Sequence, residues 1–316
     1  MTEVGQPVYG QAKQRFVFGG RAVVARSYLY VPATAGDKLA KVLQRGADAV
    51  IVDLEDAVPF PAKDGARADV VAWLEGLDGR SDVDRRPAGP PDVEIWVRLN
   101  AGEPGLVDAA AVAAPRVAGV MLAKTETREE IDALDAVLTD AEQRRGLPSG
   151  SIGVVPLLES AAALLRAPAI AAGPRVVRLQ VGEADLAADL GFGEDADDAD
   201  WAPIRSQIVV TSAAAGISAP VAPVSTDFRD LDALAASTRA LARRGYVGRA
   251  CIHPAQVSVV NDVFTPSEQR LAAARALIAT FDRAVEAGQG VIVGPDGRMI
   301  DEAVVRRARN LVALAR

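Results

Sequence analysis

Two acidic residues, Glu159 and Asp185, follow two apolar segments of this 316-residue sequence. The segments 152–158 and 176–181 have the length and β-branched content of buried strands, and an Ala- and Leu-rich helix candidate lies between them. A strand–helix–strand unit brings the carboxyl ends of its strands to one edge of a parallel sheet. Two carboxylates there suit Mg²⁺, although acids in such positions also cap the helices that follow, and the residue types alone favour neither reading.

Ionisable side chains follow other predicted strands in the same way. Acids gathered at one place repel one another unless a cation joins them, so such a group favours a divalent metal. An arginine among them suggests an anionic substrate held by the two-pronged guanidinium. Each residue alone has a structural explanation, and Lys124 also fits a Schiff-base lysine. The group comprises Glu55, Asp56, Arg98, Lys124, Glu159, Glu183, Asp185 and His253.

Eight strand candidates alternate with helix candidates between residues 27 and 263. Eight such units predict an α/β fold of the (β/α)8 TIM barrel type, in which active sites lie at the carboxyl ends of the strands. A doubly wound open sheet is the competing architecture. The strands are expected at 27–31, 49–54, 93–99, 117–123, 152–158, 176–181, 217–222 and 249–252.

The rest of the chain does not fit the barrel. The acidic stretch 191–200 is expected to be a solvated loop, with a helix beginning at residue 204. After the barrel, a long helix, a hairpin with a Pro-Asp-Gly turn and an amphipathic helix follow one another. We therefore divide the chain into a mobile N-terminal arm (1–25), a TIM barrel (26–266) and a C-terminal helix–hairpin–helix extension (267–316) that packs on a neighbouring subunit.

Composition narrows the functional classes. The chain is 50% hydrophobic and 24% charged with a net charge of -7, which argues against a nucleic-acid surface. No signal peptide and no apolar run long enough to span a membrane is recognised. Cys251 and His253 are the only cysteine and histidine, which excludes a zinc site built from several such ligands and predicts a reducing, cytoplasmic setting.

Six segments of the chain stand in the order of a known family. Their combination resembles the citrate lyase β-subunit-like group of the HpcH/HpaI aldolase superfamily, which includes malyl-CoA and citramalyl-CoA lyases. The likeness runs from residue 26 to the end of the chain. The segments are R-S-Y-L-Y-V-P (26–32), G-A-D-A-V-I-V-D-L-E-D-A-V (46–58), V-R-L-N (97–100), L-L-E-S (157–160), G-E-A-D-L-A-A-D-L-G (182–191) and C-I-H-P-A-Q (251–256).

The resemblance implies a TIM barrel that uses Mg²⁺ to cleave or form a carbon–carbon bond in a 3-hydroxyacyl-CoA. Malyl-CoA, methylmalyl-CoA and citramalyl-CoA are the implied substrates, and glyoxylate or pyruvate is the keto-acid product. It also implies a homo-oligomer, a trimer or a dimer of trimers. By match, Glu159 and Asp185 bind the metal, Arg98 holds the keto-acid fragment, Glu55 and Asp56 order water around the metal, Arg26 lies near the substrate or the CoA tail, and Asp301 of G-R-M-I-D is an acid/base from an adjacent subunit.

Other activities fit the same residues. The β subunit of a citrate lyase complex would act on a carrier-protein thioester, and a malyl-CoA thioesterase would use the same metal and acid. A barrel that only binds CoA esters is a further alternative. The chain departs from the family pattern at Ala123, at Ser160 and within 225–234, where a common glycine is missing, and the last departure leaves the acyl-chain preference open.

Overall fold

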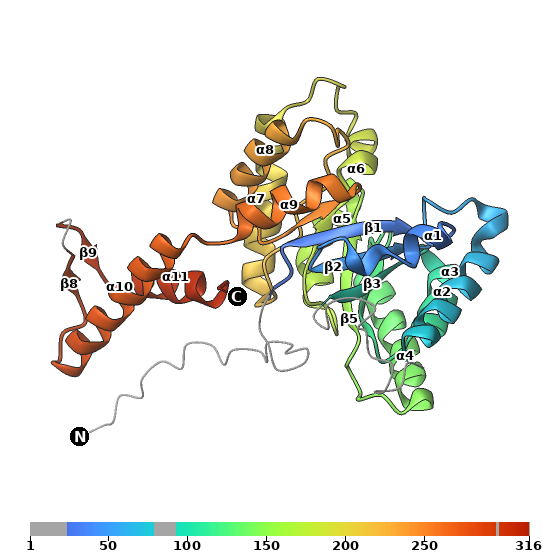
Figure 1. Cartoon of the computed structure of the whole chain (residues 1–316), viewed down its shortest axis with the longest axis horizontal. Helices are drawn as coiled ribbons and strands as arrows, with labels where there is room; N and C mark the ends of the chain where they lie inside the picture. Colours follow the sequence, from blue (N-terminus) through green and yellow to red (C-terminus); the bar gives the residue numbers. More distant parts are fainter. Residues whose placement is uncertain (1–23, 79–92, 295–296, 316) are drawn as a thin grey trace.

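The chain folds around one curled parallel sheet of seven strands, ordered β6-β5-β4-β3-β2-β1-β7 (Figure 1). The computed structural model describes residues 24–78, 93–294 and 297–315, so most of the predicted N-terminal arm lies outside the described residues. The fold is α/β and TIM-barrel-like. Its strands are β1 (Ser27–Pro32), β2 (Ala49–Asp53), β3 (Glu94–Leu99), β4 (Val117–Leu122), β5 (Gly153–Leu158), β6 (Gln180–Val181) and β7 (Arg249–Cys251).

Helices follow the strands and cover the outer face of the sheet (Figure 1). The helices form the connections between parallel neighbouring strands, which require a crossover segment of this kind. Two short 3₁₀ segments, Val42–Gln44 and Phe60–Ala62, stand beside them. The helices are α1 (Gly36–Leu39), α2 (Lys63–Asp78), α3 (Gly102–Val112), α4 (Arg128–Arg145), α5 (Ala161–Ala171), α6 (Glu183–Leu190), α7 (Asp198–Ala215), α8 (Leu231–Arg244) and α9 (Pro254–Phe264).

Alternate residues of the strands enter two different cores. On β2, Val50 and Val52 face outward into the core shared with the helices, whereas Ile51 faces the interior of the curled sheet. Tyr28 and Trp96 fill the same interior and meet edge to face, with ring centroids 6.4 Å apart. Because side chains fill the interior, it is a packed core, and chemistry is confined to its ends.

Two predicted strands are shorter than the sequence pattern indicated. Only β6 forms within 176–181, and 217–222 forms no regular strand. The segment 217–222 instead contributes single bridges on both of its sides. These bridges join Gln180 to Val221 and Ala222 to Arg249, so the segment lies between β6 and β7.

A buried arginine explains why the ladder is interrupted there. Pro220 has no N–H to donate, which weakens a strand at that position. The guanidinium of Arg178 donates instead to the carbonyls of Ala219 (2.6 Å) and Pro220 (3.2 Å), and to the hydroxyl of Tyr28 (2.5 Å). The Arg178 side chain therefore donates the hydrogen bonds that these carbonyl groups would otherwise accept from the backbone of a neighbouring strand.

The prediction of a solvated loop through residue 200 is wrong at its end, because α7 begins at Asp198. The Asp197 carboxylate accepts hydrogen bonds from the N–H groups of Ala199 (2.6 Å) and Asp200 (3.3 Å). The Asp200 carboxylate accepts in return from the Asp197 N–H at 2.9 Å. This reciprocal capping box starts the helix six residues earlier than the expected start at residue 204.

The C-terminal segment forms α10 (Glu268–Glu286), a two-stranded hairpin of β8 (Ile292–Val293) and β9 (Met299–Ile300), and α11 (Glu302–Ala313). It has a small core of its own, built from Phe281, Ile300 and Val305. The segment projects away from the curled sheet and its helices (Figure 1). Val291, Val293 and Met299 on its hairpin are more than half exposed.

None of the helices within the described ranges is both long and apolar enough to cross a membrane.

Candidate active site

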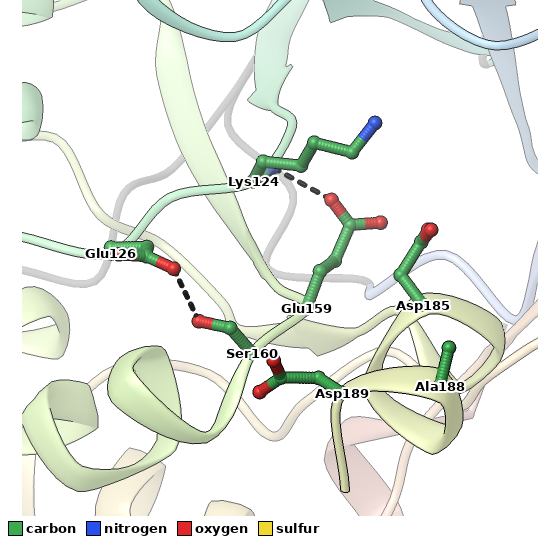
Figure 2. Close-up of a pocket in the computed structure, with 7 residues that line it drawn as sticks. All are labelled: Lys124, Glu126, Glu159, Ser160, Asp185, Ala188 and Asp189. Atoms are coloured by element: carbon green, nitrogen blue, oxygen red, sulfur yellow. Dashed lines mark hydrogen bonds between the residues drawn. The ribbon is translucent and has the colours of Figure 1, made fainter. Parts of the chain in front are cut away.

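A pocket of about 380 Å³ opens at the carboxyl ends of β4, β5 and β6 (Figure 2). Most of its polar lining is acidic, with one lysine at its edge. The parallel pairing of Leu158 with Val181 brings the ends of β5 and β6 together, which is the sequence-based expectation for this edge. The pocket is lined by Lys124, Glu126, Glu159, Ser160, Asp185, Ala188 and Asp189.

Glu159 is the buried member of the pocket. Its Oε2 accepts a hydrogen bond from the backbone N–H of Lys124 at 2.6 Å. Burial raises the pKa of Glu159 to about 7, and the negative charges of Glu55 and Asp185 act in the same direction. A bound cation would therefore stabilise the ionised form of the Glu159 carboxylate, which burial and the neighbouring negative charges disfavour.

Asp185 is the exposed member, in the first turn of α6. Its side chain does not cap that helix, since the N-cap residue is Gly182 and no side chain bonds the first N–H groups. Ser160, not Glu159, caps α5 by accepting from the N–H of Ala163 at 3.2 Å. The capping explanation for the two acids therefore has no support in the geometry.

Glu159 and Asp185 fit a magnesium site better than a site of many protein ligands. Among the residues that the structure describes, no group of three or more His, Cys, Asp and Glu side chains is arranged to hold a metal ion. Mg²⁺ characteristically takes one or two protein carboxylates and completes its shell with water and substrate oxygens. The donor set of one buried and one exposed carboxylate at the rim of a pocket meets that requirement.

Gly182 leaves the space that the Glu159 side chain occupies. A Cβ added at Gly182 would lie 2.4 Å from Glu159 Oε1 and 2.6 Å from its Cγ. We expect Gly182→Ala to fold, because the flexible carboxylate can move, but to bind Mg²⁺ about tenfold more weakly because the ligand is displaced. Calorimetric titration with Mg²⁺ checks this. Gly65→Ala, where a Cβ meets nothing within 4 Å, is the control, and equal affinity in the two variants would contradict the prediction.

Arg98 is held by Asp53, a residue that the sequence analysis did not single out. Nε and Nη2 of Arg98 donate to the two oxygens of Asp53 at 2.7 and 2.6 Å. The predicted two-pronged grip is thus made on an internal carboxylate and is not free for a substrate. The alternation of side chains along each strand could have predicted this pair. Asp53 lies two residues after Ile51 and Arg98 two residues after Trp96, so both share the interior face of the sheet.

Glu55 joins two cations at the same mouth. Its carboxylate meets Arg98 Nη1 at 3.0 Å and Lys124 Nζ at 2.6 Å. Asp56, which is exposed, lies 3.3 Å from the same Nη1 and 3.6 Å from the same Nζ. Burial raises the pKa of Glu55 above its ordinary value, although the hydrogen bond from Lys124 opposes that shift. Four of the predicted strand-end charges, Glu55, Asp56, Arg98 and Lys124, therefore form one connected network.

Lys124 holds its place through an uncommon backbone conformation. Its φ is +51°, in the left-handed region that non-glycine residues seldom adopt. This turn presents the backbone N–H to Glu159 while the side chain reaches Glu55. Figure 2 shows the Lys124 side chain extending past Glu159 on the side toward Asp185. Lys124 therefore positions both Glu159 and Glu55.

The charge state of Lys124 argues against a Schiff-base mechanism. The hydrogen bond to Glu55 raises the pKa of Lys124 to about 12, which favours the charged ammonium form at pH 7. A Schiff-base lysine must instead be neutral to attack a carbonyl. We expect borohydride added with pyruvate or glyoxylate to leave activity unchanged, and mass spectrometry to find Lys124 unmodified. A trapped adduct would restore the Schiff-base alternative.

Several predicted residues lie away from the pocket. Arg26 precedes β1, at the end of the sheet opposite the mouth, and its Nε donates to Asp48 at 2.8 Å. This position argues against a substrate contact within the same chain. Glu183 is engaged by Arg205, with both contacts at 2.7 Å. His253 caps α9 and stacks on Phe228, with ring centroids 4.8 Å apart.

Asp301 lies in the projecting C-terminal segment. It is the N-cap residue of α11, and its carboxylate accepts from the N–H of Val304 at 3.0 Å. Because that segment points away from the sheet (Figure 1), Asp301 does not join Glu159 and Asp185 within one chain.

A curled parallel α/β sheet with an acidic pocket at its carboxyl end defines a TIM-barrel-like enzyme scaffold. The model of the HpcH/HpaI aldolase/citrate lyase family matches residues 26–254, and the chain belongs to this family. The family resemblance expected from the sequence is thereby confirmed.

Named relatives cover almost the whole chain. It is 32% identical to a citrate lyase subunit beta-like protein of Deinococcus radiodurans, over 91% of this chain and 96% of the relative. It is 31% identical to an L-malyl-CoA/beta-methylmalyl-CoA lyase of Cereibacter sphaeroides, over 92% and 94%. Among solved structures, CitE of Mycobacterium tuberculosis in complex with magnesium, acetoacetate and coenzyme A is 28% identical, with a TM-score of 0.68 and coverage of 93% and 99%.

Proposed function

We propose that this protein is a Mg²⁺-dependent carbon–carbon lyase that cleaves a 3-hydroxyacyl-CoA. Malyl-CoA, methylmalyl-CoA or citramalyl-CoA would give acetyl-CoA or a homologue plus glyoxylate or pyruvate. The observation that carries the proposal is the pairing of Glu159 and Asp185 in one pocket beside the Arg98–Glu55–Lys124 network. A malyl-CoA lyase at 31% identity and a magnesium- and coenzyme-A-bound neighbour of similar fold support it.

Glu159 and Asp185 would hold the metal, and Glu55 and Asp56 would order water around it. When bound, Mg²⁺ would neutralise the acids and stabilise the negative charge that the substrate hydroxyl oxygen carries once its proton is removed, before bond cleavage turns this oxygen into the keto-acid carbonyl. Arg98 would hold the carboxylate of the keto-acid fragment through Nη1, the terminal nitrogen that Asp53 does not engage and that faces the mouth beside Glu55 and Asp56.

The cleavage is a retro-Claisen reaction. A base removes the proton of the substrate hydroxyl, the carbonyl of the keto-acid forms, and the bond between the carbinol carbon and the carbon next to the thioester breaks. Its electron pair moves into the thioester as an enolate. Asp301 would protonate the enolate carbon, which completes the acyl-CoA product, and would remove the same proton in the condensation direction.

We infer that Asp301 reaches this site from an adjacent subunit of a homo-oligomer, a trimer or a dimer of trimers. The projecting segment with its exposed hairpin residues Val291, Val293 and Met299 supports this arrangement, because exposed apolar groups of this kind mark interaction surfaces. We also infer a closed eight-position barrel over 26–266, supported by the bridges of 221 and 222 to both neighbours. The single buried thiol, Cys251, supports a reducing, cytoplasmic setting.

A citrate lyase β subunit acting on a carrier-protein thioester is the second candidate, favoured by the relative of that description. The presence of Asp301 in the extension favours the stand-alone CoA enzyme. A thioesterase would release free CoA without any keto-acid.

The deciding experiment is a cleavage assay on malyl-CoA, methylmalyl-CoA and citramalyl-CoA, with keto-acid release followed with and without Mg²⁺. Metal-dependent glyoxylate or pyruvate supports the lyase and gives its substrate class. Free CoA alone would show hydrolysis. No reaction across the panel would favour the carrier-protein thioester instead.

A further inference from the structure

The guanidinium of Arg98 has one edge held by Asp53, and its other terminal nitrogen, Nη1, faces the acids at the mouth. Asp53 and Arg98 are direct partners in the β2–β3 register, so the backbone places them opposite each other. Asp53 takes the Nε and Nη2 donors at 2.7 and 2.6 Å, and the two side chains are only 4% and 11% exposed. A bidentate pair of this burial fixes the plane of the guanidinium as well as its position.

Three further residues contact the guanidinium and limit which of its nitrogens can face the pocket. The ring of Tyr30 lies against the guanidinium, with its centroid 5.2 Å from the central carbon of Arg98. The Nη1 nitrogen points to the acids at the mouth, with Glu55 at 3.0 Å and Asp56 at 3.3 Å. Only one terminal nitrogen of Arg98, Nη1, therefore faces the mouth of the sheet, and the two-pronged Nε–Nη2 edge does not.

The same Asp53 carboxylate also shapes the turn after β2. Its two oxygens accept hydrogen bonds from the N–H groups of Glu55 at 3.0 Å and Ala57 at 3.3 Å. One buried carboxylate thus orients the cation Arg98 and the loop that carries the acids Glu55 and Asp56. Asp53 would therefore act indirectly, by orienting Arg98 and the loop that carries Glu55 and Asp56, because Asp53 itself does not line the pocket.

We propose that Asp53 is a positioning residue that locks Arg98 by its Nε–Nη2 edge, so that Nη1 alone meets the carboxylate of the keto-acid. The inference rests on the proposed function and deepens it. A consequence is that one terminal nitrogen of Arg98, together with the Lys124 ammonium that shares Glu55 with it, recognises this carboxylate in place of the two-pronged arginine grip.

The test is Asp53→Asn, which keeps the shape and an acceptor for the turn but removes the charge that holds Arg98. We expect the affinity for pyruvate or glyoxylate in the presence of Mg²⁺, measured by calorimetry, to fall about 10- to 100-fold. The affinity for coenzyme A should stay unchanged. The matched control is Glu142→Gln, which breaks a buried two-pronged pair with Arg175 (2.7 and 2.9 Å) at the opposite end of the sheet; keto-acid affinity should persist there.

A double-mutant cycle separates positioning from a general loss of structure. In an Arg98→Lys background, Asp53→Asn should cost no further keto-acid affinity, because the residue through which Asp53 acts is already changed. Should Asp53→Asn not fold, Asp53→Glu keeps the charge but shifts it by one methylene, and the same selective loss is expected. Wild-type affinity in the Asp53 variants, or additive losses in the cycle, would overturn the inference. A wild-type protein that binds no keto-acid with Mg²⁺ would instead refute the proposed function.

Discussion

Asp185→Ala is expected to abolish Mg²⁺-dependent cleavage while the fold survives. The side chain is exposed and does not cap α6, so its loss removes only a favourable charge near a helix start, worth at most about 1 kcal/mol of unfolding free energy. The metal, by contrast, would supply several kcal/mol of charge stabilisation during bond cleavage. We therefore expect turnover to fall by at least about a thousandfold, with thermal unfolding almost unchanged.

The measurement combines keto-acid release with calorimetric Mg²⁺ titration of the wild type and the variant. Glu129→Ala is the matched control, since Glu129 is also an exposed acid in the first turn of a helix that follows a strand. If helix-end charge were the whole role of Asp185, both variants would behave alike. Full activity of Asp185→Ala, or of the wild type after a chelator has removed Mg²⁺, would contradict the proposed metal site.

Asp301→Asn is expected to stop turnover and to leave Mg²⁺ and CoA-ester binding largely intact. Asparagine is as good an N-cap as aspartate, so α11 keeps its cap and the extension keeps its structure. What is lost is the ability to exchange a proton with the enolate carbon. Removal of a general acid/base lowers kcat by about 10²- to 10⁴-fold, and KM should change little because Asp301 is assigned no binding role.

Hybrid oligomers test from which subunit Asp301 acts. Asp185→Ala and Asp301→Asn chains are each expected to be inactive alone. When they are co-expressed, a site with the intact metal pair of one chain and the intact Asp301 of its neighbour should work, giving activity in about a quarter of the sites at equal mixing. Mixed chains that stay inactive would place Asp301 outside the neighbour's site. Normal turnover of Asp301→Asn would make the extension purely structural.

Local sequence patterns predicted most of the architecture. Apolar strands, capped helices and their alternation are determined by residues close together in the chain, and parallel strand–helix units bring carboxyl ends to one edge. For that reason Glu159 and Asp185 were expected together, and the structure brings them to one pocket. Arg26 was expected near the substrate or the CoA tail, and the structure instead places it just before β1, at the other end of the sheet.

The tertiary structure alone decided how the charges pair. The match of Asp53 to Arg98 depends on the register between β2 and β3, which neighbouring residues in the chain do not specify. The left-handed turn at Lys124 persists because Glu159 and Glu55 hold its backbone and its side chain. The sequence by itself determined, through strand polarity, the edge of the sheet at which the strand-end ionisable groups gather, although Glu183 and His253 are bound elsewhere. Long-range packing determined which of them bind one another and which face the pocket.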